Sequence, residues 1–293
     1  MPNAQHAAAL TEKEWSILLS RIPKQRCTPF LGAEVIGGLM PSRSEIAKQW
    51  AEESNFPLEN PHDLAQVAQF VATTALDANV AREKILDELK KASAPNFNTI
   101  DEPHRILAEL PLEVYITTDY HDFMVQALKS RHRDPRQELC QWSELLRGEK
   151  SLFDSDFKLS VANPFVFHLY GHMGIPESLV LTEDDYLNFL VEIGKKPSPI
   201  PPRIEKAFAR ASLLFLGYRL TDLEFRVLLR SLATVKRQED YRHVAVQLVH
   251  VSDQAESEEQ FARLAKIKEY YSIYCHRSSI TTYWGTTHDF LVG

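Results

Sequence analysis

Five short apolar runs alternate with stretches of helical pattern along the chain, and this alternation limits the fold more than any other feature. The runs are Thr28–Leu31, Val114–Thr117, Phe165–Tyr170, Leu213–Leu216 and Val244–Val251. Their length and their β-branched and aromatic content are typical of strands buried in a parallel sheet. Crossovers between parallel strands are right-handed and place helices on both faces of one sheet. The sequence therefore predicts an α/β protein with a Rossmann-like, doubly wound parallel sheet.

The segments between the runs carry helix signals. Thr11–Leu19 and Ser42–Ala51 each open with a capping box, Thr-x-x-Glu and Ser-x-x-Glu. His62–Asp87 is rich in Ala, Leu, Val and Gln and predicts one or two helices. Because the helix-rich part from about 51 to 110 interrupts the alternation, we expect a helical insertion there. Further helices are predicted at Glu102–Glu109, Asp122–Leu128, Glu183–Glu192, Pro202–Ala211, Leu223–Leu232 and Glu256–Tyr270.

Length and charge bound the kind of protein. We expect residues 1–293 to form a single domain with that insertion, and since the residues from Thr287 resemble the start of a helix, we also consider that the chain is the N-terminal part of a longer protein. A net charge of −7 argues against direct binding of duplex nucleic acid. The chain has no apolar stretch of roughly 18 residues and no basic-then-apolar leader, which predicts a cytoplasmic protein without a membrane partner.

Cysteine usage bears on metal sites. Cys27, Cys140 and Cys275 are widely spaced and form no Cys-x-x-Cys pair. The sequence therefore predicts neither a disulfide framework nor a structural zinc site, and no metal centre.

The first apolar run breaks into a glycine turn. Gly32, Ala33 and Glu34 follow it, and Gly37–Gly38 and Pro41–Ser42 lead toward the next helix. Doubly wound proteins hold dinucleotide phosphates at such a turn, because glycine lets the backbone approach an anion and the helix N-terminus presents free N–H groups. Glu34 stands where Gly-x-Gly has its second glycine and adds a negative charge. A purely structural turn is the alternative.

Polar residues also follow the second and fourth runs. Thr118 and Asp119 can hydrogen-bond ribose hydroxyls, whereas Asp119 or Asp122 can instead cap the helix that follows. Gly217 and Arg219 form another glycine turn, in which the arginine can meet a phosphate or pair with an acid. The carboxyl ends of parallel strands are where open α/β sheets bind ligands.

Histidine and tyrosine side chains mark the third run. Strand alternation puts His168 and Tyr170 on one face, with His172 in the turn beyond. These residue types can act as a general base or hydrogen-bond a sugar. The alternative for His168 is a satisfied core histidine.

The order of five segments resembles the sirtuin-like domains of bacterial defence proteins, over nearly the whole chain. The segments are Phe30–Ala33, Tyr115–Tyr120, His168–Gly171, Leu179–Tyr186 and Leu214–Tyr218. The resemblance implies a substrate, NAD, whose bond between nicotinamide and ribose active members break, and it implies a homo-oligomer or a partner from a defence system. Protein-deacetylating sirtuins usually carry a four-cysteine zinc ribbon, which this chain cannot build.

Three segments depart from the pattern of that family. Glu34 replaces the last glycine of Gly-Ala-Gly, Asp119 and His121 replace the Asn and Asp of Thr-Thr-Asn-Tyr-Asp, and Tyr170 replaces the histidine of His-Gly. Tyr170 would be a poor base, because the unperturbed pKa of a tyrosine is near 10.

The resemblance implies a role for each candidate residue. Asp119 would position ribose and water, and Tyr170, His168 and His172 compete for the role of base. The remaining residues would line NAD or meet its phosphates: Gly32, Ala33, Glu34, Thr118, Gly217, Arg43 and Arg219. The competing hypothesis is an inactive module for nucleotide binding, assembly or regulation.

Overall fold

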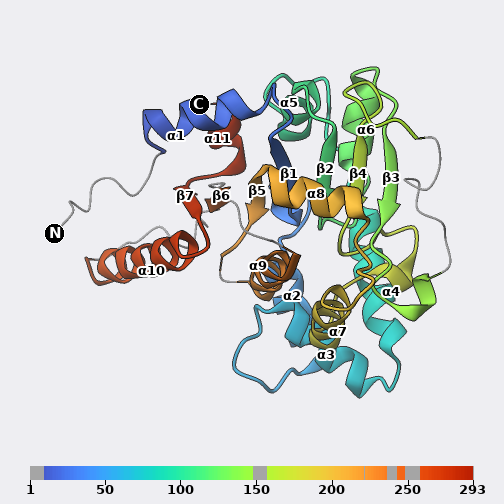
Figure 1. Ribbon diagram of the computed structural model, residues 1–293. Coiled ribbons are helices and arrows are strands. Elements are labelled where there is room, and N and C mark those ends of the chain that lie inside the picture. The colour runs from blue at the N-terminus through green and yellow to red at the C-terminus, as the bar shows by residue number, and fades with distance from the viewer. Residues whose placement is uncertain (1–9, 148–156, 221, 236–242, 248–257, 293) are drawn as a thin grey trace.

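A computed structural model of the chain describes residues 10–147, 157–220, 222–235, 243–247 and 258–292. Within these ranges seven strands form one sheet in the order β3-β4-β2-β1-β5-β6-β7, and every neighbouring pair is parallel. The strands are β1 (Cys27–Leu31), β2 (Val114–Thr117), β3 (Arg136–Leu139), β4 (Phe165–His168), β5 (Ser212–Tyr218), β6 (His243–Gln247) and β7 (Ile280–Trp284). Strands β2 to β4 lie on one side of β1 and β5 to β7 on the other, so the order reverses between β1 and β5 (Figure 1). The predicted doubly wound α/β fold is confirmed.

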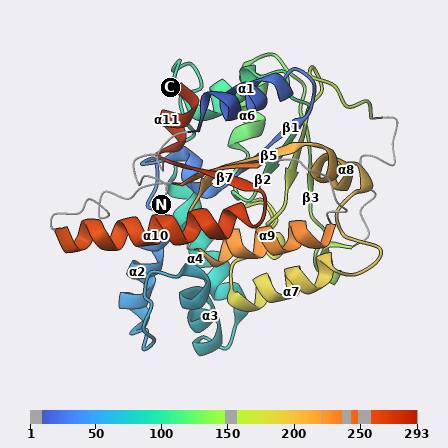
Figure 2. The same cartoon turned by 60° about the vertical axis from the view of Figure 1, so that its left-hand side comes forward.

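Helices cover both faces of the sheet (Figure 2). One face carries α1 (Glu12–Arg21), α5 (Pro103–Glu109), α6 (Phe123–Ser130) and α11 (Thr287–Val292). The other carries α2 (Arg43–Ser54), α3 (Leu64–Thr74), α4 (Ala78–Lys91), α7 (Glu183–Ile193), α8 (Pro202–Arg210) and α9 (Leu223–Val235), with α10 (Glu258–His276) beside β7. The side chains of successive strand residues point to opposite faces of the sheet. Phe30 packs in the layer that contains α2, α3 and α7, and Leu31 packs in the layer that contains α1, α5 and α6.

Most helices begin where the sequence indicates. The capping boxes at Thr11 and Ser42 are both formed. The stretch from 62 to 87 makes two helices, α3 and α4, which are separated at Leu76, where φ is 55°. Residues 248–251 of the last predicted strand and 256–257 of the last predicted helix lie outside the described residues.

The sequence analysis missed two strands and extended a third too far. The missed strands, β3 and β7, lie at the two edges of the sheet and are only partly buried, so they lack the apolar run of a central strand. Strand β4 ends at His168 instead of Tyr170, because the chain turns away at Gly171, where φ is 95°.

No helix among the described residues combines the length and the apolar character needed to cross a membrane. Cys27, Cys140 and Cys275 are buried free thiols.

Candidate functional site

The carboxyl ends of β1, β2 and β5 are joined by backbone hydrogen bonds. The Gly32 amide donates to the Leu216 carbonyl at 2.8 Å, and the Thr118 amide donates to the Leu31 carbonyl at 2.8 Å. The residues that follow these three strands therefore lie together, beside the point where the strand order reverses. This is the position of ligand sites in open α/β sheets.

The two glycine turns pack directly against each other. A Cβ on Gly32 would lie 2.3 Å from the Gly217 carbonyl oxygen, and one on Gly217 would lie 2.4 Å from the Val35 amide nitrogen. Gly217 also has a φ of +73°. Backbone packing therefore explains why both positions need glycine. Ala33 opens a short 3-10 helix, η2 (Ala33–Ile36), and whether these residues line a bound ligand stays a prediction.

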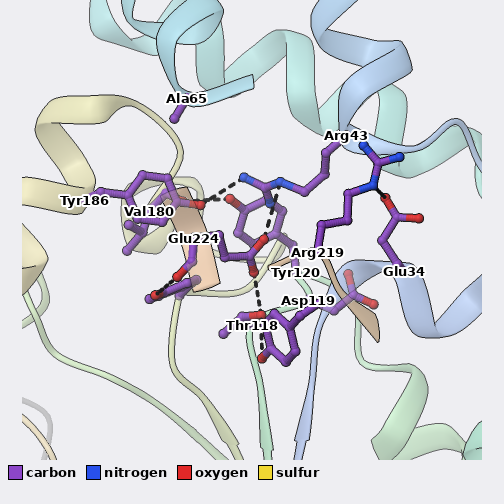
Figure 3. A network of polar contacts seen from close by, with 12 residues as sticks. Glu34, Arg43, Ala65, Thr118, Asp119, Tyr120, Val180, Tyr186, Arg219 and Glu224 are labelled. Atoms are coloured by element: carbon purple, nitrogen blue, oxygen red, sulfur yellow. Dashed lines mark hydrogen bonds and ion pairs between the residues drawn. The ribbon is translucent and has the colours of Figure 1, made fainter. Parts of the chain in front are cut away.

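Glu34 and Arg219 connect the two turns. Arg219 Nε lies 3.8 Å from Glu34 Oε1, and each side chain is 14% exposed (Figure 3). Arg219 was expected either to meet a phosphate or to pair with an acid, and the structure shows it paired with an acid.

A buried polar network surrounds Glu224 of α9 (Figure 3). The Thr118 hydroxyl donates to Glu224 Oε1 at 2.6 Å, and Arg43 Nε lies 3.5 Å from Oε2. Arg43 Nη2 also donates to the Tyr186 hydroxyl at 2.9 Å, and the hydroxyls of Thr118 and Tyr218 lie 3.0 Å apart. Arg43 and Thr118 thus hold a carboxylate that the sequence analysis missed. The one signal in the sequence for this residue was a carboxylate in the first turn of the helix that follows β5.

Asp119 pairs with His121. His121 Nδ1 lies 3.1 Å from Asp119 Oδ1, and both side chains are buried. Asp122 is the N-cap residue of α6, but its side chain accepts from the Gln126 side chain and not from a helix amide. Asp119 accepts from the His121 amide ahead of the helix. The capping alternative is therefore wrong for Asp119, and Asp122 holds the cap position without the side-chain hydrogen bond.

Tyr170 is enclosed by the core. Its side chain is fully buried between Tyr186 and Phe189, and its hydroxyl donates to the Glu224 carbonyl at 3.0 Å. Burial and the nearby Glu224 charge raise the pKa of Tyr170 well above its ordinary value. A tyrosine that is neutral and already donating cannot accept a proton, so the structure argues against Tyr170 as a base.

His168 and His172 differ in their exposure to solvent. His168 is 1% exposed, its Nε2 lies 3.1 Å from Gln137 Oε1, and burial together with the neighbouring His172 lowers its pKa to about 3. The alternative of a core histidine therefore describes His168 well. His172 is half-buried, its Nδ1 accepts from the Gly174 amide, and burial lowers its pKa also. Both rings are neutral at pH 7.

Two cavities flank the pair of Glu34 and Arg219. Arg219, Arg43 and Glu224 line one of about 210 Å³. Glu34 lines the other, of about 540 Å³, together with residues before α5 and at the start of α11. Small-molecule sites typically occupy about 300–1,000 Å³, so the first cavity is smaller than a dinucleotide needs. Among the described residues no group of His, Cys, Asp and Glu side chains is placed to hold a metal ion.

The parallel sheet and the polar cluster at its switch point define a doubly wound α/β domain of the kind that binds nucleotides. A family model described as a SIR2-like domain matches residues 113–273, more than half of the chain. The chain belongs to this SIR2-like family.

Curated relatives share this part of their length. NAD(+) hydrolase ThsA of Acinetobacter baumannii (strain 532279) is 22% identical over 204 residues, which are 69% of this chain and 38% of that protein. NAD(+) hydrolase ThsA of Enterococcus faecium is 23% identical over 225 residues, 73% of this chain and 42% of that protein. The protein of that name from Bacillus cereus (strain MSX-D12) is 23% identical over 204 residues, with coverages of 69% and 38%. The chain spans about two fifths of these relatives.

Proposed function

We propose that this chain binds NAD⁺ where the turns after β1, β2 and β5 meet, and hydrolyses it to nicotinamide, ADP-ribose and a proton. Membership in the SIR2-like family and the relatives named NAD(+) hydrolase support this proposal. The resemblance to sirtuin-like domains of bacterial defence proteins extends it to antiphage defence in the cytoplasm, with a homo-oligomer or a defence-system partner.

The buried carboxylate of Asp119 is the observation that carries the proposal. It lies directly after β2, and its exposed fraction is 6%. Loss of neutral nicotinamide from NAD⁺ leaves positive charge on the ribose, and a carboxylate in a site that excludes water stabilises such an oxocarbenium-like transition state. Asp119 keeps the acceptor that a ribose hydroxyl requires, although it lacks the donor of an asparagine amide.

His172 is the base candidate that we retain. Its ring is neutral, and because Nδ1 accepts from the Gly174 amide, Nε2 carries the ring hydrogen. Water that attacks the ribose carbon must release one proton, and we propose that His172 Nδ1 leaves the Gly174 amide to accept it.

The dinucleotide needs more room than the smaller cavity gives. Glu34 lines one cavity and Arg219 the other, and we propose that separation of this pair joins the two spaces. We propose that the NAD⁺ pyrophosphate displaces Glu34 from Arg219, whose guanidinium suits a phosphate.

Calorimetry and product analysis together test this function. Full-length protein is titrated with NAD⁺ and assayed for nicotinamide release, beside the variants Asp119→Ala and Asp134→Asn. We expect binding and release by wild type, loss of release in Asp119→Ala, and no change in Asp134→Asn, whose carboxylate is exposed.

A second candidate, an inactive module that binds nucleotide, is favoured by one observation. Tyr170 fills the position of the family's histidine with a hydroxyl that is already committed to Glu224. Binding of NAD⁺ without nicotinamide release under any condition would support this module over the hydrolase.

A further inference from the structure

We propose that His121 is a positioning residue, which as a buried imidazolium holds the Asp119 carboxylate in one orientation. This inference rests on the proposed NAD⁺ hydrolysis and adds a second member to its site.

The hydrogen-bond partners of His121 define its charge. Nδ1 lies 3.1 Å from Asp119 Oδ1, and Nε2 lies 3.1 Å from the carbonyl oxygen of Leu89. A carbonyl and an ionised carboxylate only accept hydrogen bonds, so both ring nitrogens must donate and therefore both carry hydrogen. A buried charge requires a partner of opposite sign, and Asp119 supplies it.

Three elements lock the ring in place. His121 stacks on Phe123 of α6, with ring centroids 4.3 Å apart and planes 7° apart. Leu89 belongs to the last turn of α4, where helix carbonyls carry partial negative charge that favours a cation. The His121 amide also lies 3.4 Å from Asp119 Oδ1. Phe123 and the Leu89 carbonyl thus fix the ring, and the two contacts from His121 to Oδ1 restrict rotation of the Asp119 carboxylate.

This arrangement leaves one carboxylate oxygen for the substrate. Both contacts from His121 reach Asp119 Oδ1, and Oδ2 has no hydrogen-bond partner within the described part of the chain, which leaves it for a ribose hydroxyl or water. Burial alone disfavours the imidazolium, but the hydrogen bond and charge of Asp119, the Leu89 carbonyl and Asp122 raise the pKa of His121 above its ordinary value. His168 and His172 are titratable rings nearby, and the charge on His121 helps to lower the pKa of His172.

Exchange of donor and acceptor tests the positioning role. His121→Gln should lower kcat for nicotinamide release about 10- to 100-fold with little change in KM, because the carboxylate loses its orientation. The double variant Asp119→Asn, His121→Asp keeps a donor–acceptor contact with the roles exchanged, because the amide at position 119 can donate to the carboxylate at position 121, and it should release nicotinamide faster than either single variant. A double variant no faster than its parents would contradict the positioning role.

The pH profile and the charge of the ring add readouts that simple packing would not move. Wild-type kcat should fall as the pH rises through the raised pKa of His121, and this limb should be absent from His121→Gln. Nitrogen-15 NMR of the wild-type protein should show both His121 nitrogens protonated at pH 7. A neutral His121 in an active wild type would overturn the positioning role alone, whereas a wild type that releases no nicotinamide would overturn the hydrolysis and the positioning role with it.

Discussion

The carboxylate of Glu34 faces the guanidinium of Arg219 across 3.8 Å, beside the point where the strand order of the sheet reverses. Doubly wound proteins commonly hold a phosphate of their ligand at this place. Here an internal carboxylate pairs with the arginine, and the two residues line different cavities. An anionic ligand that binds to Arg219 must therefore compete with the Glu34 carboxylate for the guanidinium.

Removal of the Glu34 charge should tighten NAD⁺ binding. In Glu34→Gln the pyrophosphate no longer competes with a carboxylate for Arg219, so we expect Kd to fall about tenfold, equivalent to about 1.4 kcal/mol. Titration calorimetry measures the change. Glu34→Asp, which keeps the charge, serves as the matched control and should bind like wild type. An unchanged or larger Kd in Glu34→Gln would show that the pair does not oppose the ligand.

Glu224 and Arg43 should be strongly coupled in stability. Their side chains are 7% and 13% exposed, and removal of one charge leaves the other buried without its partner. We expect Glu224→Gln to lower the free energy of unfolding by about 3 kcal/mol. The double variant with Arg43→Met should lose less than the sum of the single losses in urea denaturation. Additive losses would contradict the coupling.

Gly217 should not tolerate a side chain. A methyl group would lie 2.4 Å from the Val35 amide nitrogen at a φ of +73°, so Gly217→Ala should lower the free energy of unfolding by at least about 2 kcal/mol. Gly194→Ala is the control, because its φ is −74° and the nearest atom to a new Cβ lies at 3.4 Å. Thermal denaturation compares them, and equal stability of the two variants would refute the packing of the turns.

His168 should make the protein less stable in acid. Its pKa of about 3 in the folded state lies below that of the unfolded chain, so the unfolded state binds the proton first as the pH falls below about 6.5. Stability is therefore complete above that pH and falls by up to about 1.4 kcal/mol per pH unit below it. Urea denaturation between pH 7 and pH 4 should show a shallower decline in His168→Gln. The exposed His276, changed to Gln, is the control and should decline like wild type. Equal slopes for His168→Gln and wild type would contradict the assignment.

Local sequence patterns predicted the central strands because the apolar residues that favour a strand are the same residues that the fold buries. The apolar runs of β1, β2 and β5 are buried on both faces, and the Thr11 and Ser42 caps depend only on neighbours in sequence. Arg136–Leu139 was missed because an edge strand can remain polar.

The site was only partly predictable. The strand ends were found, since topology alone brings them together. The partners of Arg43 and His121 were not, because Glu224 and the Leu89 carbonyl reach the site from helices whose placement depends on tertiary packing. Tyr170 is a similar case, since only the fold reveals that its hydroxyl is committed to a backbone carbonyl.

Nicotinamide release from NAD⁺ by the full-length protein tests the central claim most directly. The assay uses enzyme at concentrations comparable with substrate, so that even slow turnover is seen, and follows nicotinamide and ADP-ribose by chromatography. We predict equal amounts of the two products from wild type and none from Asp119→Ala that retains its fold. Release at the wild-type rate by folded Asp119→Ala, or no release by wild type, would contradict the account.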